Sequence, residues 1–274
     1  MKKSKQQIYE LDNSGIMHLS LLRDGKPNVW RISLTMHETV DRDILQQAVN
    51  AVCPRFPYLV AGIRRGFTKH YLVPSKTIPT VIDDRENLAF MTREEIERCG
   101  FRVLCADRKI SIEVFHSITD GYGGFVFMNA LACEYLRLKK GISFEDDASV
   151  IKPDSPIDPA EFEDGYTACA GMPETALNST ASYQLPGENL MHTPLHTTTA
   201  IFNVQDILSA ARQHKTSITG FLTAVMAHSI LEIQAKHGND SRPVQLMVPI
   251  NLRNMLGNCF CKSCNSANDK EQSA

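Results

Sequence analysis

Hydrophobic residues recur at two different periods along the first 140 positions, and together these periods predict a mixed α/β fold. Alternating apolar and β-branched residues predict strands over residues 28–37, 58–64, 69–73, 101–106 and 109–116. Apolar residues spaced three and four apart predict helices over residues 42–53, 92–98 and 121–139. Capping residues support two of these helix starts, Asp41 before the first helix and the Thr92–Glu95 pair at the second.

The pattern weakens after residue 140. Six prolines interrupt a polar stretch over residues 141–195, which is typical of a crossover connection or linker that holds one short helix near 159–166. Beyond this stretch the same rules predict strands over 197–203 and 244–250 and helices over 205–213 and 217–236.

This order of elements predicts how the chain is divided. We expect an N-terminal subdomain over residues 1–140, a linker over 141–195, the start of a second subdomain over 196–255 and a disordered tail over 256–274. The roughly 60 ordered residues after the linker are fewer than a complete domain needs. The sequence therefore indicates a complete first subdomain and a second one that is only begun.

Composition excludes several classes of protein. Of the 274 residues, 43% are hydrophobic and 22% are charged, which are the proportions of an ordinary globular protein. A formal net charge of -2 creates no field that would attract nucleic acid or an anionic membrane. Lys2 and Lys3 are followed by polar residues where a signal peptide requires an apolar core, and no run approaches the roughly 20 apolar residues of a membrane span. These features predict a cytoplasmic protein.

The eight cysteines show no disulfide framework. Five of them lie in apolar or helical segments, where a reduced cysteine is usually a small core residue: Cys53, Cys99, Cys105, Cys133 and Cys169. Cys259, Cys261 and Cys264 are spaced like metal ligands, but no fourth ligand lies near them in an otherwise polar tail. We therefore predict no metal site.

The most informative residue is His116, at the end of the predicted strand 109–116. The alternation of that strand places the imidazole on the same side as Ile112 and Val114, where a titratable group needs a partner or a task. A neutral imidazole with an ordinary pKa of about 6.5 is suited to general-base catalysis near neutral pH. The alternative interpretation is a core histidine that is hydrogen-bonded to a carbonyl group.

The chain turns directly after His116, at Asp120 and Gly121, and three glycines open the next helix. Backbone N–H groups at a helix start can stabilise an anion, and the missing side chains leave room for a substrate. A plain tight turn explains the glycines equally well. No Gly-x-Ser-x-Gly sequence and no His-Glu-x-x-His sequence is present, and the other histidines, His18 among them, are assigned no role.

These residues resemble the chloramphenicol acetyltransferase and condensation-domain superfamily, in particular its bacterial alcohol O-acetyltransferase-like proteins. The sequence His-x-x-x-Asp-Gly, from His116 to Gly121, is similar to the active-site signature of the superfamily. Phe115 stands where condensation domains carry an additional histidine. Further segments that resemble the family occur in the family's order: residues 9–14, 55–58 (Arg-Phe-Pro-Tyr), 163–164 (Glu-Asp), 217–227 and 248–253.

The resemblance implies a chloramphenicol acetyltransferase-like α/β sandwich and a transfer of an acyl group, with acetyl favoured, from acyl-CoA to an alcohol. His116 would be the general base of direct transfer in a ternary complex, with acyl-CoA as co-substrate and no bound cofactor. In the family, the aspartate of the signature points away from the histidine and pairs with a downstream arginine. Asp120, Gly121 and Arg253 match positions that support the site, while a simple turn or N-cap is the alternative role for Asp120.

Two other functions remain open at this point. The resemblance ends near Arg253, whereas family members continue through most of a second subdomain, so the chain could be a truncated, non-catalytic remnant. A condensation-type enzyme that takes its acyl group from a carrier protein is the second alternative, and Phe115 disfavours it. No nucleic-acid or membrane partner is expected.

Overall fold

The computed structural model describes residues 8–22, 28–85, 88–144, 150–158, 161, 181–187, 198–238 and 240–249. The chain divides into two compact units. The described residues of unit 1 lie within 8–161 and those of unit 2 within 181–249. The predicted subdomain boundaries stay predictions.

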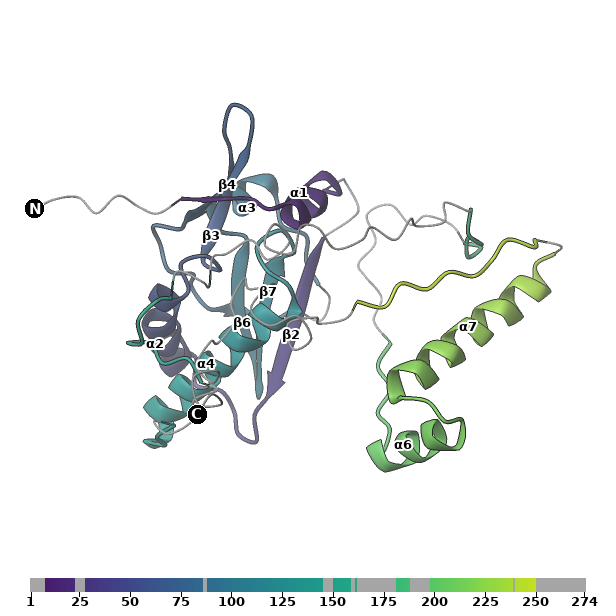
Figure 1. Cartoon of the computed structure of the whole chain (residues 1–274). Helices are drawn as coiled ribbons and strands as arrows, with labels where there is room; N and C mark the ends of the chain where they lie inside the picture. The colour runs from purple at the N-terminus through teal and green to yellow at the C-terminus, as the bar shows by residue number, and fades with distance from the viewer. Residues whose placement is uncertain are drawn as a thin grey trace, which may run out of the picture. The chain divides into compact units, whose positions relative to one another are not determined.

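Unit 1 contains two β-sheets (Figure 1). In the smaller sheet, β1 (Tyr9–Glu10), β4 (His70–Pro74) and β3 (Ala61–Arg65) pair antiparallel in that order. The larger sheet has the order β2 (Val29–Thr35), β7 (Lys109–Phe115), β6 (Phe101–Ala106) and β5 (Ile82–Asp83). Its first three strands are antiparallel and β5 runs parallel to β6.

The described helices of unit 1 are α1 (Asn13–Ser20), α2 (Arg42–Val52), α3 (Arg93–Cys99) and α4 (Gly121–Lys140), with a short 3-10 helix, η1 (Cys53–Arg55), directly after α2. The Asp41 carboxylate accepts hydrogen bonds from two N–H groups in the first turn of α2. Thr92 and Glu95 form a reciprocal capping box at α3, as predicted. Within the described residues, α4 contacts α2, β2 and β7, and α3 packs against β3.

The secondary structure predicted for the first 140 residues is confirmed, and its boundaries agree within two residues except at the start of β3. Strand β3 begins at Ala61 rather than at residue 58, because Leu59 and Val60 donate their N–H groups to the Phe56 carbonyl in a turn. Among the described residues, the prediction missed four short elements, β1, α1, η1 and β5. They are only two to eight residues long, too short for a periodic pattern to stand out.

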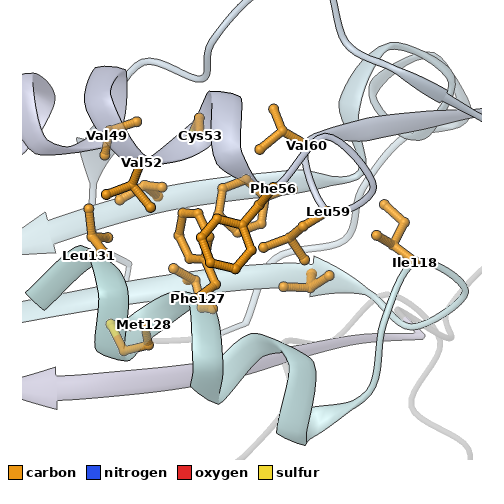
Figure 2. Packing of buried hydrophobic residues seen from close by; sticks show 14 of the residues in the cluster. Val49, Val52, Cys53, Phe56, Leu59, Val60, Ile118, Phe127, Met128 and Leu131 are labelled. Atoms are coloured by element: carbon orange, nitrogen blue, oxygen red, sulfur yellow. The ribbon is translucent and has the colours of Figure 1, made fainter. Parts of the chain in front are cut away.

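Aromatic rings form the centre of the unit 1 core. Phe56, in the turn after α2, meets Phe127 of α4 edge to face, with the ring centroids 5.2 Å apart (Figure 2). Phe127 makes a second edge-to-face contact with Phe101 of β6 at 4.9 Å. All three side chains are at most 2% exposed, so the Arg-Phe-Pro segment contributes a core residue through Phe56.

The larger sheet also buries charge. The Glu113 side chain of β7 is fully buried and accepts hydrogen bonds from Arg31 of β2 and Arg102 of β6. Asp84, which is 1% exposed, forms ion pairs with Arg31 and Lys109. The alternation of β7 therefore separates a buried aliphatic set (Ile110, Ile112 and Val114) from an ionic set (Lys109 and Glu113), both of whose charges are paired and of which Glu113 is buried.

Unit 2 contains two described helices, α6 (Val204–Gln213) and α7 (Ile218–Lys236), as predicted. The strands predicted over 197–203 and 244–250 are wrong: their described residues, 198–203 and 244–249, form no strand. A strand needs a partner whose backbone groups it can pair with, and the described elements of unit 2 are helices. The short helix predicted near 159–166 falls outside the described residues except at position 161.

By length and composition alone, α7 could cross a membrane, since it is 19 residues long and an 18-residue window within it has a mean hydropathy of 1.3. One such helix is weak evidence, because the core helix of a globular protein passes the same test. Within unit 2, several of its apolar side chains are exposed: Leu222, Val225, Met226 and Leu231.

A buried ion pair attaches part of the predicted linker to the first subdomain. Arg55 donates two hydrogen bonds to the Glu161 carboxylate, at 2.8 and 2.6 Å, and a third to the Ser155 hydroxyl. Both charged side chains are 5% exposed. Burial and the negative charge of Glu161 raise the pKa of Tyr9, so β1 lies close to the same pair.

Removing one partner of this pair is expected to destabilise unit 1. Arg55→Met leaves the Glu161 carboxylate buried and unpaired, which costs about 3–5 kcal/mol of unfolding free energy. Urea denaturation followed by circular dichroism measures the loss. The double variant Arg55→Met/Glu161→Leu, which buries no charge, should recover part of it, and Arg65→Met at an exposed position should change stability by less than about 0.5 kcal/mol. Equal midpoints for Arg55→Met and Arg65→Met would contradict this account.

Candidate active site

His116 lies where strand β7 passes into the turn before α4. Its backbone N–H donates to the carbonyl oxygen of Asn28 at 2.9 Å, which extends the β2–β7 pairing by one residue. The side chain is half-buried, between the fully buried Phe115 and the buried Ser117. The strand end therefore presents the imidazole without enclosing it.

The surroundings of His116 keep its imidazole neutral. Burial lowers the pKa of His116 below its ordinary 6.5, and the neighbouring His18 lowers it further. A hydrogen bond to the residue's own backbone and the charge of Asp120 act in the opposite direction, and the net shift is downward. Because this hydrogen bond favours the protonated ring, the backbone group in it must be the His116 carbonyl, which accepts a ring N–H. The other ring nitrogen then keeps its lone pair, as a base requires.

His18 stacks on His116, a contact that was not predicted from the sequence. The His18 ring, from α1, lies parallel to the His116 ring with an interplanar angle of 8° and 3.8 Å between centroids. Asp12 is the N-cap of helix α1, and its carboxylate accepts the Gly15 N–H at 2.7 Å. That Asp-Asn-Ser cap was the available signal for the helix, but nothing local indicates which histidine it would meet.

Trp30 of β2 forms a second wall of the site. Its ring meets that of His116 edge to face, with 6.3 Å between centroids, and its indole N–H donates to the Thr119 carbonyl at 3.2 Å. A side chain at Gly124 would overlap the Trp30 ring. Gly124 is therefore required for the close approach of α4 to β2.

Asp120 is the N-cap of α4, and its carboxylate accepts the Gly123 N–H at 3.0 Å. Gly121, one residue later, is exposed, and a Cβ atom added there would meet nothing within 4 Å. The predicted role of Gly121 in leaving room for a substrate stays a prediction. Arg253, the predicted partner of Asp120, lies outside the described residues, as do Glu163 and Asp164. The Asp120–Arg253 pair stays a prediction.

Two hydroxyl groups in the turn are buried without a hydrogen-bond partner among the described residues. They belong to Ser117 and Thr119, which are 3% and 5% exposed. Native structures pair nearly all buried polar groups, so two exceptions between His116 and Asp120 set this turn apart from the core.

Three of the four described free cysteines, Cys53, Cys99 and Cys105, are poor nucleophiles. Burial raises the pKa of Cys53 and of Cys105, and raises that of Cys99 to about 11. These thiols are protonated at neutral pH and therefore weakly reactive. Cys259, Cys261 and Cys264 lie outside the described residues. Among the side chains that the structure places, no group of three His, Cys, Asp or Glu residues could hold a metal ion.

A cavity of about 550 Å³ lies elsewhere in unit 1. It is lined by the second half of α4, including Cys133 and Arg137, and by residues 150–154. The predicted site residues that the structure describes, His116, Asp120 and Gly121, do not line it. Its size alone does not make it the site, because the perturbed histidine lies at the other end of α4.

Comparison with known proteins supports the fold. No protein-family model and no curated protein sequence matches the chain. The structure of polyketide synthase associated protein 5 from Mycobacterium tuberculosis superposes with a TM-score of 0.52 at 16% identity, over 84% of this chain and 58% of that one. The chain thus has the predicted chloramphenicol acetyltransferase-like fold, and it spans less than two thirds of the length of that relative.

Condensation domains are also similar, at lower TM-scores. The starter condensation domain of rhizomide synthetase RzmA gives 0.42 at 13% identity, over 50% of this chain and 39% of that one. The first condensation domain of the calcium-dependent antibiotic synthetase gives 0.40 at 15% identity, over 50% and 39%. The fold assignment rests on the mycobacterial structure.

The contact between Gly124 and Trp30 predicts a localised structural effect. Gly124→Ala forces the indole away from α4, and such overpacking costs about 1–3 kcal/mol of unfolding free energy. Trp30 is the only tryptophan in the chain, so its fluorescence reports both the displacement and the unfolding midpoint. Gly121→Ala, where no atom lies within 4 Å, is the matched control. Identical spectra and midpoints for the two variants would show that Trp30 does not need Gly124.

Proposed function

We propose that this protein transfers an acyl group, acetyl being the simplest, from acyl-CoA to the hydroxyl group of an alcohol, with His116 as general base. The observation that carries the proposal is the half-buried imidazole of His116, held neutral at a strand end beside the start of α4. The proposal also draws on the similarity of the His116–Gly121 sequence to the superfamily's signature.

The chemistry follows from the lone pair on His116. As the alcohol oxygen attacks the thioester carbonyl, its proton passes to the free ring nitrogen. The tetrahedral oxyanion then collapses, the carbon–sulfur bond breaks, and the thiolate takes the proton back from the imidazolium. The products are an ester and free CoA, and neither an acyl-enzyme nor a metal ion is needed.

The beginning of α4 is suited to the charge that develops in this reaction. N–H groups at a helix N-terminus point outward and favour negative charge. Gly121 lies there with open space around it, so an oxyanion could approach the backbone closely. Asp120 serves this arrangement structurally, because its carboxylate holds the first turn in place through Gly123.

Phe115 bears on the identity of the acyl donor. Condensation domains carry a histidine at the position of Phe115, whose side chain here is fully buried in the core. Phe115 therefore cannot serve as a second polar group in the site. This favours a donor that diffuses freely, acyl-CoA, over one attached to a carrier protein.

Acyl transfer is tested with purified protein, acetyl-CoA and a panel of short and long alcohols, with ester formation and CoA release measured together. His116→Ala should lower kcat by about 10²–10⁴-fold, the usual contribution of a general base. His37→Ala, at an exposed position after the other end of β2, is the control. Equal rates for wild type and His116→Ala would remove His116 from the mechanism. Transfer from acetylated carrier protein but not from acetyl-CoA would favour the condensation-type alternative.

The lowered pKa of His116 predicts the pH profile. A general base works in its neutral form, and a lowered pKa preserves that form at lower pH. We expect the acid limb of kcat/KM to have its midpoint below pH 6.5, the ordinary pKa of histidine. A midpoint above pH 6.5 would show that another group, or a raised pKa, controls the reaction.

A further inference from the structure

The ring of His18 stacks on the ring of His116 and restricts its movement. The rings of His18 and His116 are nearly parallel and 3.8 Å apart, so one face of the His116 imidazole is covered. Trp30 meets the same ring at an interplanar angle of 68°. A ring with one face covered and a neighbour at an angle has little freedom to rotate, whereas an unconstrained histidine at the end of a strand can adopt several rotamers.

Asn28 holds His18 in this position. The Asn28 side chain lies against both the backbone carbonyl and the Nδ1 atom of His18, the latter at 3.2 Å. Because a carbonyl oxygen can only accept, the Asn28 amide nitrogen must face it, and the amide oxygen must face Nδ1. Nδ1 of His18 therefore carries a hydrogen, which fixes both the tautomer and the plane of the ring.

The same residue also positions His116. The Asn28 carbonyl accepts the His116 backbone N–H at 2.9 Å, so one residue contacts both histidines. Asn28 has a φ of 41°, in the left-handed region that asparagine tolerates better than most residues. Its side chain and its carbonyl can thus serve different histidines.

Titratable neighbours also act on the His116 ring. In the part of the chain that the structure describes, two titratable groups act on the His116 ring: His18 of α1, and Asp120 at the start of α4. Burial is the largest influence and lowers the pKa of His116. His18 lowers it further, and Asp120 raises it. Trp30 adds an uncharged edge.

We infer that His18 is a positioning residue: its imidazole, fixed by Asn28, sets the plane of the His116 ring so that the ring edge meets the acceptor hydroxyl. A misplacement of a catalytic group by about 1 Å can lower the reaction rate about 10²-fold, so the loss of this constraint on the His116 ring should lower the rate measurably. The inference rests on the proposed role of His116. It adds a second residue that acts on the reaction through His116 without contacting the reacting atoms.

The test uses three variants and two independent readouts. His18→Ala uncovers the ring, His18→Phe keeps an aromatic ring without its charge or its bond to Asn28, and Asn28→Gly removes the side-chain clamp while tolerating the positive φ. His37→Ala is the control. The first readout is the NMR titration of the His116 ring proton, assigned with His116→Gln. The second is the pH profile of kcat and KM for acetyl transfer.

In His18→Ala, the titration midpoint of His116 should move to higher pH, because both burial and the neighbouring charge decrease. The kcat should fall about 10–100-fold with KM for acetyl-CoA changed less than about twofold, and the acid limb should move with the NMR midpoint. Asn28→Gly should show a smaller change in the same direction, and His37→Ala none. If His18→Ala does not fold, His18→Phe, which fills similar space, replaces it in both readouts.

The two readouts separate the two proposals. An unchanged midpoint and unchanged kcat in His18→Ala and His18→Phe, with an active wild type, would overturn the inference and leave the proposed function intact. A shifted midpoint together with no acetyl transfer by any protein would support the coupling of the histidines and overturn the proposed acyl transfer.

Discussion

The antiparallel pairing of β2 with β7 is the constraint on which the site depends. Its register, Val29 opposite Phe115, leaves Asn28 opposite His116 at the open end of the ladder. The backbone hydrogen bond between those two residues fixes the position of the His116 main chain, from which the imidazole extends. The Asn28 side chain holds His18, which stacks on His116. Since a slip of one residue reverses the faces of a strand, the aliphatic and ionic sets of β7 that hold the register also hold the site.

This arrangement has an energetic cost that the rest of unit 1 offsets. The native state keeps His116 in surroundings that lower its pKa, so it binds protons more weakly than the unfolded chain does. Unfolding therefore becomes more favourable as the pH falls through the lowered pKa. The sheet that carries His116 also buries Glu113, which is stable only because Arg31 and Arg102 neutralise it. The site is thus built on elements whose stability comes from elsewhere, chiefly the aromatic core between α2 and α4.

Sequence patterns predicted what is local and missed what depends on distant residues. The Asp41 cap, the Thr92–Glu95 capping box and the turn between β6 and β7 are encoded within a few positions, and all three are present. The partner of Arg55 lies 106 residues away, and that of His18 lies in another element, so no window of sequence contains them. The strands expected near 197–203 and 244–250 failed for the same reason. Strand propensity describes a residue's fit to a sheet, and the described part of unit 2 contains no sheet to join.

The three glycines after Asp120 show how one motif can contain separate functions. From the sequence, the three glycines could be interpreted only as a group. They could form an anion site, leave room for a substrate or make a tight turn. In the structure, Gly123 provides the N–H that Asp120 caps, and Gly124 makes way for the Trp30 ring. Gly121 alone faces open space. Two of the three glycines therefore build the turn, and this frees the first to meet a ligand. The Asp-Gly pair works as a unit because its aspartate fixes the helix whose first residue stays accessible.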